Sequence, residues 1–253
     1  MGSVVGMASD TVSETPLEPV PEDWERCLAV VAHPDDLEFG ASTALARWSA
    51  QGKTIVEVLA TRGEAGIDGM EPAEAARVRS EEQLASAAVV GVETVEFLDH
   101  VDGALVLGLD LRRDLTRAIR RHRPDVVVTL SFREQWRGGG GWNHVDHRVL
   151  GEALVDAVRD AANRWVFPEL VAEGHEPWGG VRFVLAASSP RSGHYVDVTD
   201  SLDAGIASLE AHRAYIEGLG GSFQAATFLR GMAEPTGREV GVGAAVAFEL
   251  IPT

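Results

Sequence analysis

Short apolar runs rich in β-branched residues alternate with helix-like segments along most of the chain, and this alternation constrains the fold most strongly. Such runs are typical of strands buried on both faces, and parallel strands need a crossover, usually a helix, between them. The pattern therefore predicts an α/β domain with a mostly parallel sheet and helices on both faces. We expect strands at 28–32, 54–59, 93–98, 125–130, 182–187, 194–198 and 244–251. We expect helices at 72–90, 109–122, 145–162 and 202–219, and an earlier one that ends at Gly52.

The composition describes an acidic chain with an ordinary hydrophobic core. Its 253 residues, 45% hydrophobic and 24% charged, suffice for one sizeable domain. The formal net charge of −17 argues against a nucleic acid or a membrane surface as partner, because phosphate binding needs clustered Lys and Arg. We interpret the one basic cluster, at 112–123, as the solvated face of a helix.

The N-terminal segment and the single cysteine give further expectations about organisation. Residues 1–24 are polar, acidic and contain prolines, without the basic start or apolar core of a signal peptide. We interpret them as a disordered or loosely attached leader before a single, Rossmann-like domain at 25–253. Cys27 excludes an internal disulfide and fits a reducing compartment, so we expect a cytoplasmic protein. The sequence is compatible with a homo-oligomer but does not specify one.

Four residues at the end of the first expected strand bring metal-capable side chains together. The strand runs into His33-Pro34-Asp35-Asp36, and Pro34 fixes φ and removes a hydrogen-bond donor, so the chain must turn here. Imidazole and carboxylate together suit a zinc-like ion, and the adjacent carboxylate is available as a base. An aspartate cap on the next helix, with a core histidine nearby, explains the tetrapeptide equally well.

A second polar cluster, Asn143-His144-Val145-Asp146-His147, follows the strand at 125–130 and opens the next helix. His144 and His147 share a face of a helical turn, and Asp146 is placed to accept a hydrogen bond from one imidazole. Alone, this motif reads as an Asn143 cap with two surface histidines. Two such clusters at strand-to-helix turns of one sheet instead favour a shared metal site, because sites collect at the carboxyl ends of parallel strands. Three ligands without cysteine are typical of catalytic zinc, and such a site is equipped for amide hydrolysis.

The segments AHPDDLEFG and NHVDHRVLG resemble the LmbE/PIG-L-like family of zinc-dependent N-deacetylases. Weaker similarities extend from Arg26 to near the end of the chain, and they include Arg79-Ser80-Glu81-Glu82, Asp102-Gly103, Pro124-Asp125 and Ala211-His212. The resemblance implies that Zn²⁺ is bound by His33, Asp36 and His147. It further implies Asp35 as the general base, His144 as the acid or oxyanion stabiliser, and Asp146 as the residue that orients His144.

The resemblance also implies a substrate side of the site. Arg79 and Asp102 would bind sugar hydroxyls; a helix-surface salt bridge for Arg79 and a turn with Gly103 for Asp102 are the alternatives. His212 would line the pocket or lie on a helix face, since Arg213-Ala214-Tyr215 departs from the usual family residues there.

The insert at 132–142 (FREQWRGGGGW) is the most individual feature of the sequence. Trp136 and Trp142 flank four flexible glycines, and indole faces are good platforms for sugar rings. We therefore expect Trp142 to contact the substrate and the insert to close as a lid; an ordinary surface loop with one buried tryptophan is the alternative.

The resemblance implies hydrolysis of an N-acyl group, most simply N-acetyl, from a GlcNAc-type amino-sugar conjugate. The alternatives are an amidase that acts on a thiol-pseudodisaccharide conjugate and a non-catalytic zinc- or sugar-binding protein. A binding protein needs neither base nor acid, so the presence of Asp35 and His144 favours an enzyme. The absence of a glycine-rich phosphate fingerprint after the first strand argues against a nucleotide-binding domain. The natural acceptor, the acyl chain and the physiological metal stay open at this stage, because Fe²⁺ and Co²⁺ accept the same ligands.

Overall fold

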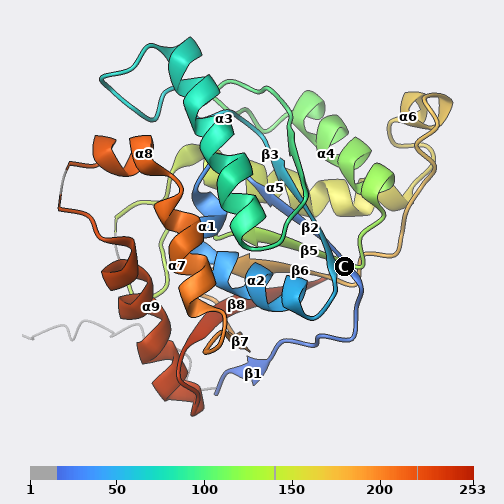
Figure 1. The fold of residues 1–253 in the computed structure, drawn as a ribbon. Coiled ribbons are helices and arrows are strands. Elements are labelled where there is room, and N and C mark those ends of the chain that lie inside the picture. Colours follow the sequence, from blue (N-terminus) through green and yellow to red (C-terminus); the bar gives the residue numbers. More distant parts are fainter. Residues whose placement is uncertain (1–15, 140, 221) are drawn as a thin grey trace, which may run out of the picture.

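The computed structural model, which describes residues 16–139, 141–220 and 222–253, contains one mixed β-sheet (Figure 1). Its strands are β1 (Glu18–Pro19), β2 (Arg26–Val31), β3 (Thr54–Leu59), β4 (Thr94–Phe97), β5 (Val126–Leu130), β6 (Phe183–Ala187), β7 (His194–Asp197) and β8 (Ala245–Pro252). They are ordered β1-β7-β8-β6-β5-β2-β3-β4. β8 runs antiparallel to β6 and β7, and the other neighbours pair in parallel. The expected mostly parallel sheet is confirmed.

The helices follow the predicted alternation with four differences. They are α1 (Asp36–Gly40), α2 (Ser42–Ala50), α3 (Pro72–Val89), α4 (Leu109–His122), α5 (Val145–Ala162), α6 (Pro168–Ala172), α7 (Leu202–Glu210), α8 (Arg213–Gly218) and α9 (Ala225–Val240). The expected helices at 109–122 and 145–162 have the predicted bounds. The helix expected at 202–219 is divided into α7 and α8 at Ala211 and His212, and the expected early helix is divided into α1 and α2. Neither α6 nor α9 was expected. No helix in the described part of the chain has the length and apolar character that crossing a lipid bilayer requires.

The sheet separates two hydrophobic cores. Successive side chains of a strand point to opposite faces, so Ala29 and Val31 of β2 join one core while Leu28 and Val30 join the other. The first core is completed by α1, α2, α7 and α9, and the second by α4 and α5. Helices therefore cover both faces of the sheet, as the buried, uniformly apolar strands require (Figure 1).

The chain order reverses between β2 and β5. From β2 the sheet grows through β3 to β4 in one direction, and β5 and β6 are then added on the other side of β2. In open α/β sheets, ligands bind in the crevice that opens at such a switch point, beyond the carboxyl ends of the strands. The two polar clusters follow these two neighbouring strands, so the topology brings them to the same edge.

The structure corrects two expectations in part. Residues 16–24 are not part of a loose leader, because β1 pairs with β7 and because Leu17, Val20 and Trp24 are buried. Residues 1–15 lie outside the described residues.

The basic cluster on α4 is not entirely a solvated face. Arg120 is only 2% exposed, and its guanidinium donates hydrogen bonds to main-chain carbonyls at the end of α5 and in the following turn.

Candidate functional site

The turn between β2 and α1 places two carboxylates side by side in the interior. Asp35 has a left-handed backbone (φ 80°) and Asp36 is the first residue of α1. Asp36 Oδ2 accepts hydrogen bonds from the amides of Ala32 (3.1 Å) and His33 (2.9 Å), which anchors the carboxylate on the turn itself. Its other oxygen is left to face His147, whose Nε2 lies 3.0 Å from Asp36 Oδ1.

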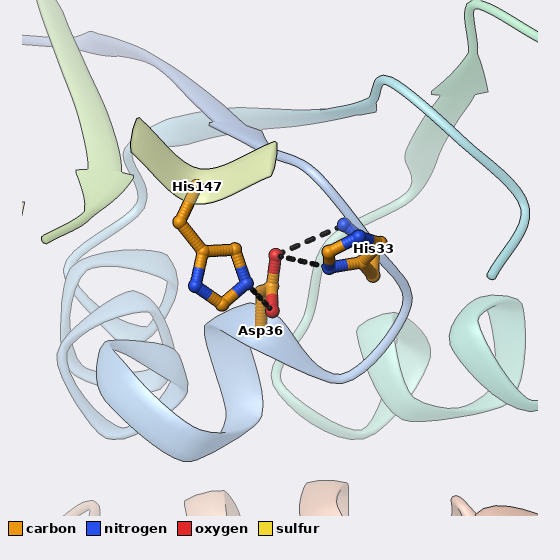
Figure 2. A group of neighbouring side chains, drawn as sticks. All are labelled: His33, Asp36 and His147. Atoms are coloured by element: carbon orange, nitrogen blue, oxygen red, sulfur yellow. Dashed lines mark hydrogen bonds and ion pairs between the residues drawn. The ribbon is translucent and has the colours of Figure 1, made fainter. Parts of the chain in front are cut away.

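His33, Asp36 and His147 form a compact group of donor atoms (Figure 2), which we call the metal group. One ligand atom from each lies within 4.8 Å of the other two, which is the spacing expected around a single cation. His33 Nδ1 faces Asp36 Oδ2 at 3.5 Å, while the opposite ring nitrogen, Nε2, is directed at two further carboxylates. The predicted ligand set therefore comes from the turn after β2, from the start of α1 and from α5.

Three carboxylates surround the imidazole of His33. The side chains of Asp36, Asp102 and Asp146 contact this imidazole, and none of them is more than 7% exposed. Burial alone lowers the pKa of His33, but the three carboxylates outweigh it and raise the pKa to about 12. A proton on His33 thus supplies the charge that a bound dication would supply in its place. Two imidazoles and one carboxylate are a donor set that suits zinc.

Asn143 fixes which nitrogen of His147 faces this site. Its side-chain oxygen lies 2.9 Å from His147 Nδ1, so Nδ1 donates to Asn143 and Nε2 is the nitrogen that faces Asp36. The amide nitrogen of Asn143 donates to the carbonyls of Ser131 (2.7 Å) and Arg133 (2.9 Å). The sequence suggested only a helix cap, but Asn143 contacts His147, one of the predicted metal ligands, and orients its ring.

Replacing Asn143 by alanine is expected to weaken zinc binding by about 10- to 100-fold, because His147 loses the partner that sets its tautomer. Asn143→Asp is the matched control, since a carboxylate still accepts from His147 Nδ1 but does not donate to Ser131 and Arg133. Competition with a chromogenic chelator measures both affinities. Equal losses in the two variants would show that the loop bonds, and not the histidine bond, are responsible.

Asp146 does not orient His144 in the expected way. Its carboxylate is fully buried and lies 3.3 Å from His33 Nε2, and it accepts hydrogen bonds from the amides of Gly103 (2.7 Å) and Leu105 (3.1 Å). Burial raises the pKa of Asp146, but His33 and these amides hold it below its ordinary value. His144 instead receives a hydrogen bond on Nδ1 from the Asp146 main-chain amide, at 3.2 Å. A second possible metal group, His33, His144 and Asp146, shares His33 with the first.

His144 stands at the open side of the metal group. Its side chain is exposed, and its ring lies 5.1 Å from that of His33 and 5.5 Å from that of His147, centroid to centroid. Partial burial and the neighbouring His33 lower the pKa of His144, so the ring is neutral at neutral pH. Because Nδ1 accepts the Asp146 amide, the neutral ring carries its proton on Nε2.

The side chain of Asp35 is held by Arg79, which we expected to bind a sugar hydroxyl or to form a salt bridge on a helix surface. Arg79 of α3 is 2% exposed, and its Nη2 lies 2.6 Å from Asp35 Oδ2 and 2.7 Å from the Pro34 carbonyl. Its Nη1 donates to the Gly63 carbonyl, so a helix-surface salt bridge is ruled out. Burial raises the pKa of Asp35 to about 7, while Arg79 works in the opposite direction.

Asp102 is both a turn residue and a neighbour of the metal group. Its Oδ1 lies 3.1 Å from His33 Nε2, and its Oδ2 accepts the Ala65 amide at 2.8 Å. Gly103, at φ 78°, forms the turn that the sequence suggested. Burial raises the pKa of Asp102, but the bond to His33 outweighs it and leaves the pKa lowered.

The metal group lies in a cleft of about 260 Å³. Besides His33, Asp35, Asp36, His144 and His147, its walls include Ala65, Gly66, Arg79, Asp102, Gly103 and Tyr215. Trp142 is not among the described lining residues: it is 64% exposed, with Arg148 over its ring at 5.2 Å. Tyr215 of α8 is the aromatic residue among the described walls of the cleft that belongs to neither metal-binding motif, and the Arg79 guanidinium lies 4.4 Å from its ring centroid.

The insert at 132–142 is fastened at several points. Arg133 pairs with Glu249 of β8, the Arg137 amide donates to the Ser188 carbonyl at 3.0 Å, and Trp136 packs edge-on against the ring of His147. Gly140 lies outside the described residues. The role of the insert as a lid stays a prediction.

His212 precedes α8 and is fully buried, 3.6 Å from Glu38. It is not among the described residues that line the cleft, so its interior position differs from both of the expected ones.

The comparison with known families bears directly on this geometry. Residues 28–158, slightly more than half of the chain, match the PIG-L family, described as GlcNAc-PI de-N-acetylase. The chain belongs to the PIG-L family. The matched range contains every residue of the metal group together with Asp35, Arg79, Asp102 and His144, whereas Tyr215 and His212 lie beyond it.

Individual members of the PIG-L family show the same relationship. The chain is 27% identical over 198 residues to the diacetylchitobiose deacetylase of Thermococcus kodakarensis. This alignment covers 76% of this chain and 70% of the relative. It is 30% identical over 215 residues to the 1D-myo-inositol 2-acetamido-2-deoxy-alpha-D-glucopyranoside deacetylase 2 of Saccharopolyspora erythraea, covering 72% and 71%. The solved N,N'-diacetylchitobiose deacetylase of Pyrococcus horikoshii, at 24% identity, superposes with a TM-score of 0.81 over 91% of this chain and 85% of that one, which confirms the fold.

Proposed function

We propose that this protein is a zinc-dependent N-deacetylase that hydrolyses the N-acetyl group of a GlcNAc-type amino-sugar conjugate. The observation that carries the proposal is the group of His33, Asp36 and His147 in an open cleft, with the buried Asp35 carboxylate beside it. Three protein ligands with an accessible position are the arrangement of catalytic zinc. Relatives named as deacetylases of diacetylchitobiose and of an acetamido-glucopyranoside support the choice of substrate class.

We assign a different role in amide hydrolysis to each of three side chains in the cleft. When bound, zinc polarises the amide carbonyl and acidifies a water molecule. Asp35 is the proposed base that accepts the proton of the attacking water, and its raised pKa suits that task. His144, neutral and protonated on Nε2, is the proposed group that donates a hydrogen bond to the developing negative charge; to act as the acid for the departing amine, it would first have to gain a second proton. Arg79 holds the carboxylate of Asp35 through the 2.6 Å contact.

The substrate side of the cleft differs from the expectation at the aromatic residue. Asp102 lines the cleft and remains the proposed partner of a sugar hydroxyl. Arg79 also lines it, but its hydrogen bonds to Gly63, Pro34 and Asp35 favour a role in holding the base. Tyr215 replaces Trp142 as the proposed surface for the sugar ring, since aromatic faces pack well against sugars and Tyr215 is in the wall.

Tyr215→Ala is expected to raise KM for an N-acetylglucosamine conjugate by about 10-fold, as the loss of one aromatic contact of 1–1.5 kcal/mol implies. Trp142→Ala is the matched control, because this exposed aromatic lies outside the described wall of the cleft. Steady-state kinetics of both variants test the assignment. A raised KM in Trp142→Ala with normal kinetics in Tyr215→Ala would restore Trp142 as the platform.

The direct test of the proposed function is acetate release by the zinc-loaded protein. We expect release from diacetylchitobiose or from an inositol-linked N-acetylglucosamine, and loss of release after treatment with a chelator. A thiol-pseudodisaccharide conjugate with an N-acylcysteine amide is the third substrate, which separates a deacetylase from the amidase alternative. Absence of turnover on all three substrates, with one zinc ion bound per chain, would contradict the proposal and favour a binding protein.

A further inference from the structure

The proposed base sits on a backbone conformation that must be held in place. Asp35 has φ 80° and ψ −19°, in the left-handed region where a side chain costs about 1–2 kcal/mol. Although Asp35 occupies the cap position of α1, its side chain makes no capping bond. The direction of its carboxylate therefore depends on what fastens the turn from outside.

Helix α3 contacts Asp35 at two points one helical turn apart. Arg79 binds the carboxylate, and Gln83, four residues later on the same face, binds the main chain: the Asp35 amide donates to Gln83 Oε1 at 3.0 Å. Gln83 is fully buried. The cleft does not include Gln83 among its described walls, so the residue acts on Asp35 from behind.

Two glutamates fix the orientation of the Gln83 amide. Its Nε2 donates to Glu38 Oε1 and to Glu57 Oε2, each at 3.0 Å, which uses both amide hydrogens. The oxygen is then the atom left to accept from Asp35. Glutamine is the side chain of this length that donates to two carboxyl groups and accepts from an amide at the same time. Burial, together with the neighbouring Glu38, raises the pKa of Glu57 well above its ordinary value.

We infer that Gln83 is a positioning residue of the deacetylase reaction, which fixes the Asp35 turn so that the carboxylate faces the metal group. The inference rests on the proposed function, since it takes Asp35 as the base. Arg79 restrains the charged end of Asp35 and Gln83 restrains its backbone, so α3 clamps the base from both ends. This role gives a reason for the buried polar network of Gln83, Glu38 and Glu57, which also contacts Ser86 and His212, because unfilled hydrogen bonds in the interior are costly.

The test replaces Gln83 by methionine, which has a similar length and no amide. We expect kcat to fall by about 10- to 100-fold, the range known for groups that orient active-site side chains, with zinc content unchanged. KM should change by no more than about twofold, because Gln83 does not contact substrate. Thr116→Val is the matched control: Thr116 is fully buried and has no side-chain hydrogen-bond partner among the described residues. We expect its kinetics to equal those of the wild type.

A double variant separates positioning from a general effect on the fold. In an Asp35→Asn background, Gln83→Met should cause no further loss of the residual rate, because the carboxylate that it positions is gone. An equal fold-loss in both backgrounds would overturn the inference.

Hydrogen exchange at the Asp35 amide supplies a readout without substrate. We expect this amide to exchange at least about 10-fold faster in Gln83→Met than in the wild type, since its acceptor is lost. Unchanged protection would overturn the role of Gln83, whatever the activity. Failure of the wild type to release acetate would instead reject the proposed function, and the exchange result would still decide whether Gln83 holds the turn.

Discussion

Asp35→Asn is expected to lower kcat by about 10²- to 10⁴-fold while leaving one zinc ion bound per chain, because asparagine cannot accept the proton of the attacking water. Asparagine is the right replacement here, since it tolerates the left-handed backbone at φ 80°. Steady-state kinetics and elemental analysis of the same preparation give the two quantities. Retained activity would contradict the assigned base, and loss of the metal would show that Asp35 and Asp36 exchange roles.

The effect of the same substitution on stability is expected to be small. Arg79 and Asp35 form a buried pair whose side chains are 3% and 7% exposed. Removing the charge of Asp35 takes the carboxylate partner from Arg79, but Arg79 keeps its hydrogen bonds to the Gly63 and Pro34 carbonyls, and the buried carboxylate is itself destabilised, as its raised pKa shows. Because these effects oppose each other, we expect the Tm of Asp35→Asn to stay close to that of the wild type. A circular-dichroism melt provides the check.

His147→Ala is expected to weaken zinc binding by about two orders of magnitude or more and to abolish activity, because one of three protein ligands is removed. The matched variant is His144→Ala, three residues away on the same turn. It should bind zinc normally and still lose most of kcat, since His144 is assigned to proton transfer or charge stabilisation.

Zinc titration of the two histidine variants also decides between the overlapping donor groups of the site. One group contains His147, and the other contains His144 with Asp146. Normal zinc binding in His147→Ala together with loss of zinc in His144→Ala would select the second group. That outcome would contradict the assigned centre.

The parts of the fold that the sequence predicted well have clear periodicity and clear end signals. α4 and α5 have amphipathic patterns, and both were predicted with their observed bounds. α9 was missed because Pro235 and Gly237 look like helix breakers. In the structure, Gly237 instead allows close packing, since a Cβ there would lie 2.7 Å from Ala244 Cα. A glycine required by a tertiary contact cannot be told from a local breaker without the fold.

The metal group was predictable because both motifs end neighbouring parallel strands. The residues that contact those motifs were not predictable from the sequence. Asp146 contacts His33, which is 113 residues away in sequence, and this depends on how two turns face each other across the switch point. The burial of Arg79 and the place of Tyr215 depend in the same way on the docking of α3 and α8. Local residue type gives the chemistry of a site, while tertiary packing decides which groups share a hydrogen bond.

The central claim is that His33, Asp36 and His147 together bind one divalent cation beside Asp35. Anomalous diffraction at the zinc edge from crystals of the zinc-loaded protein tests this most directly. The account predicts a single strong peak within bonding distance, about 2.0–2.2 Å, of one atom from each of these three side chains. A peak at His144 and Asp146, or a zinc-loaded protein with no peak at this turn, would contradict it.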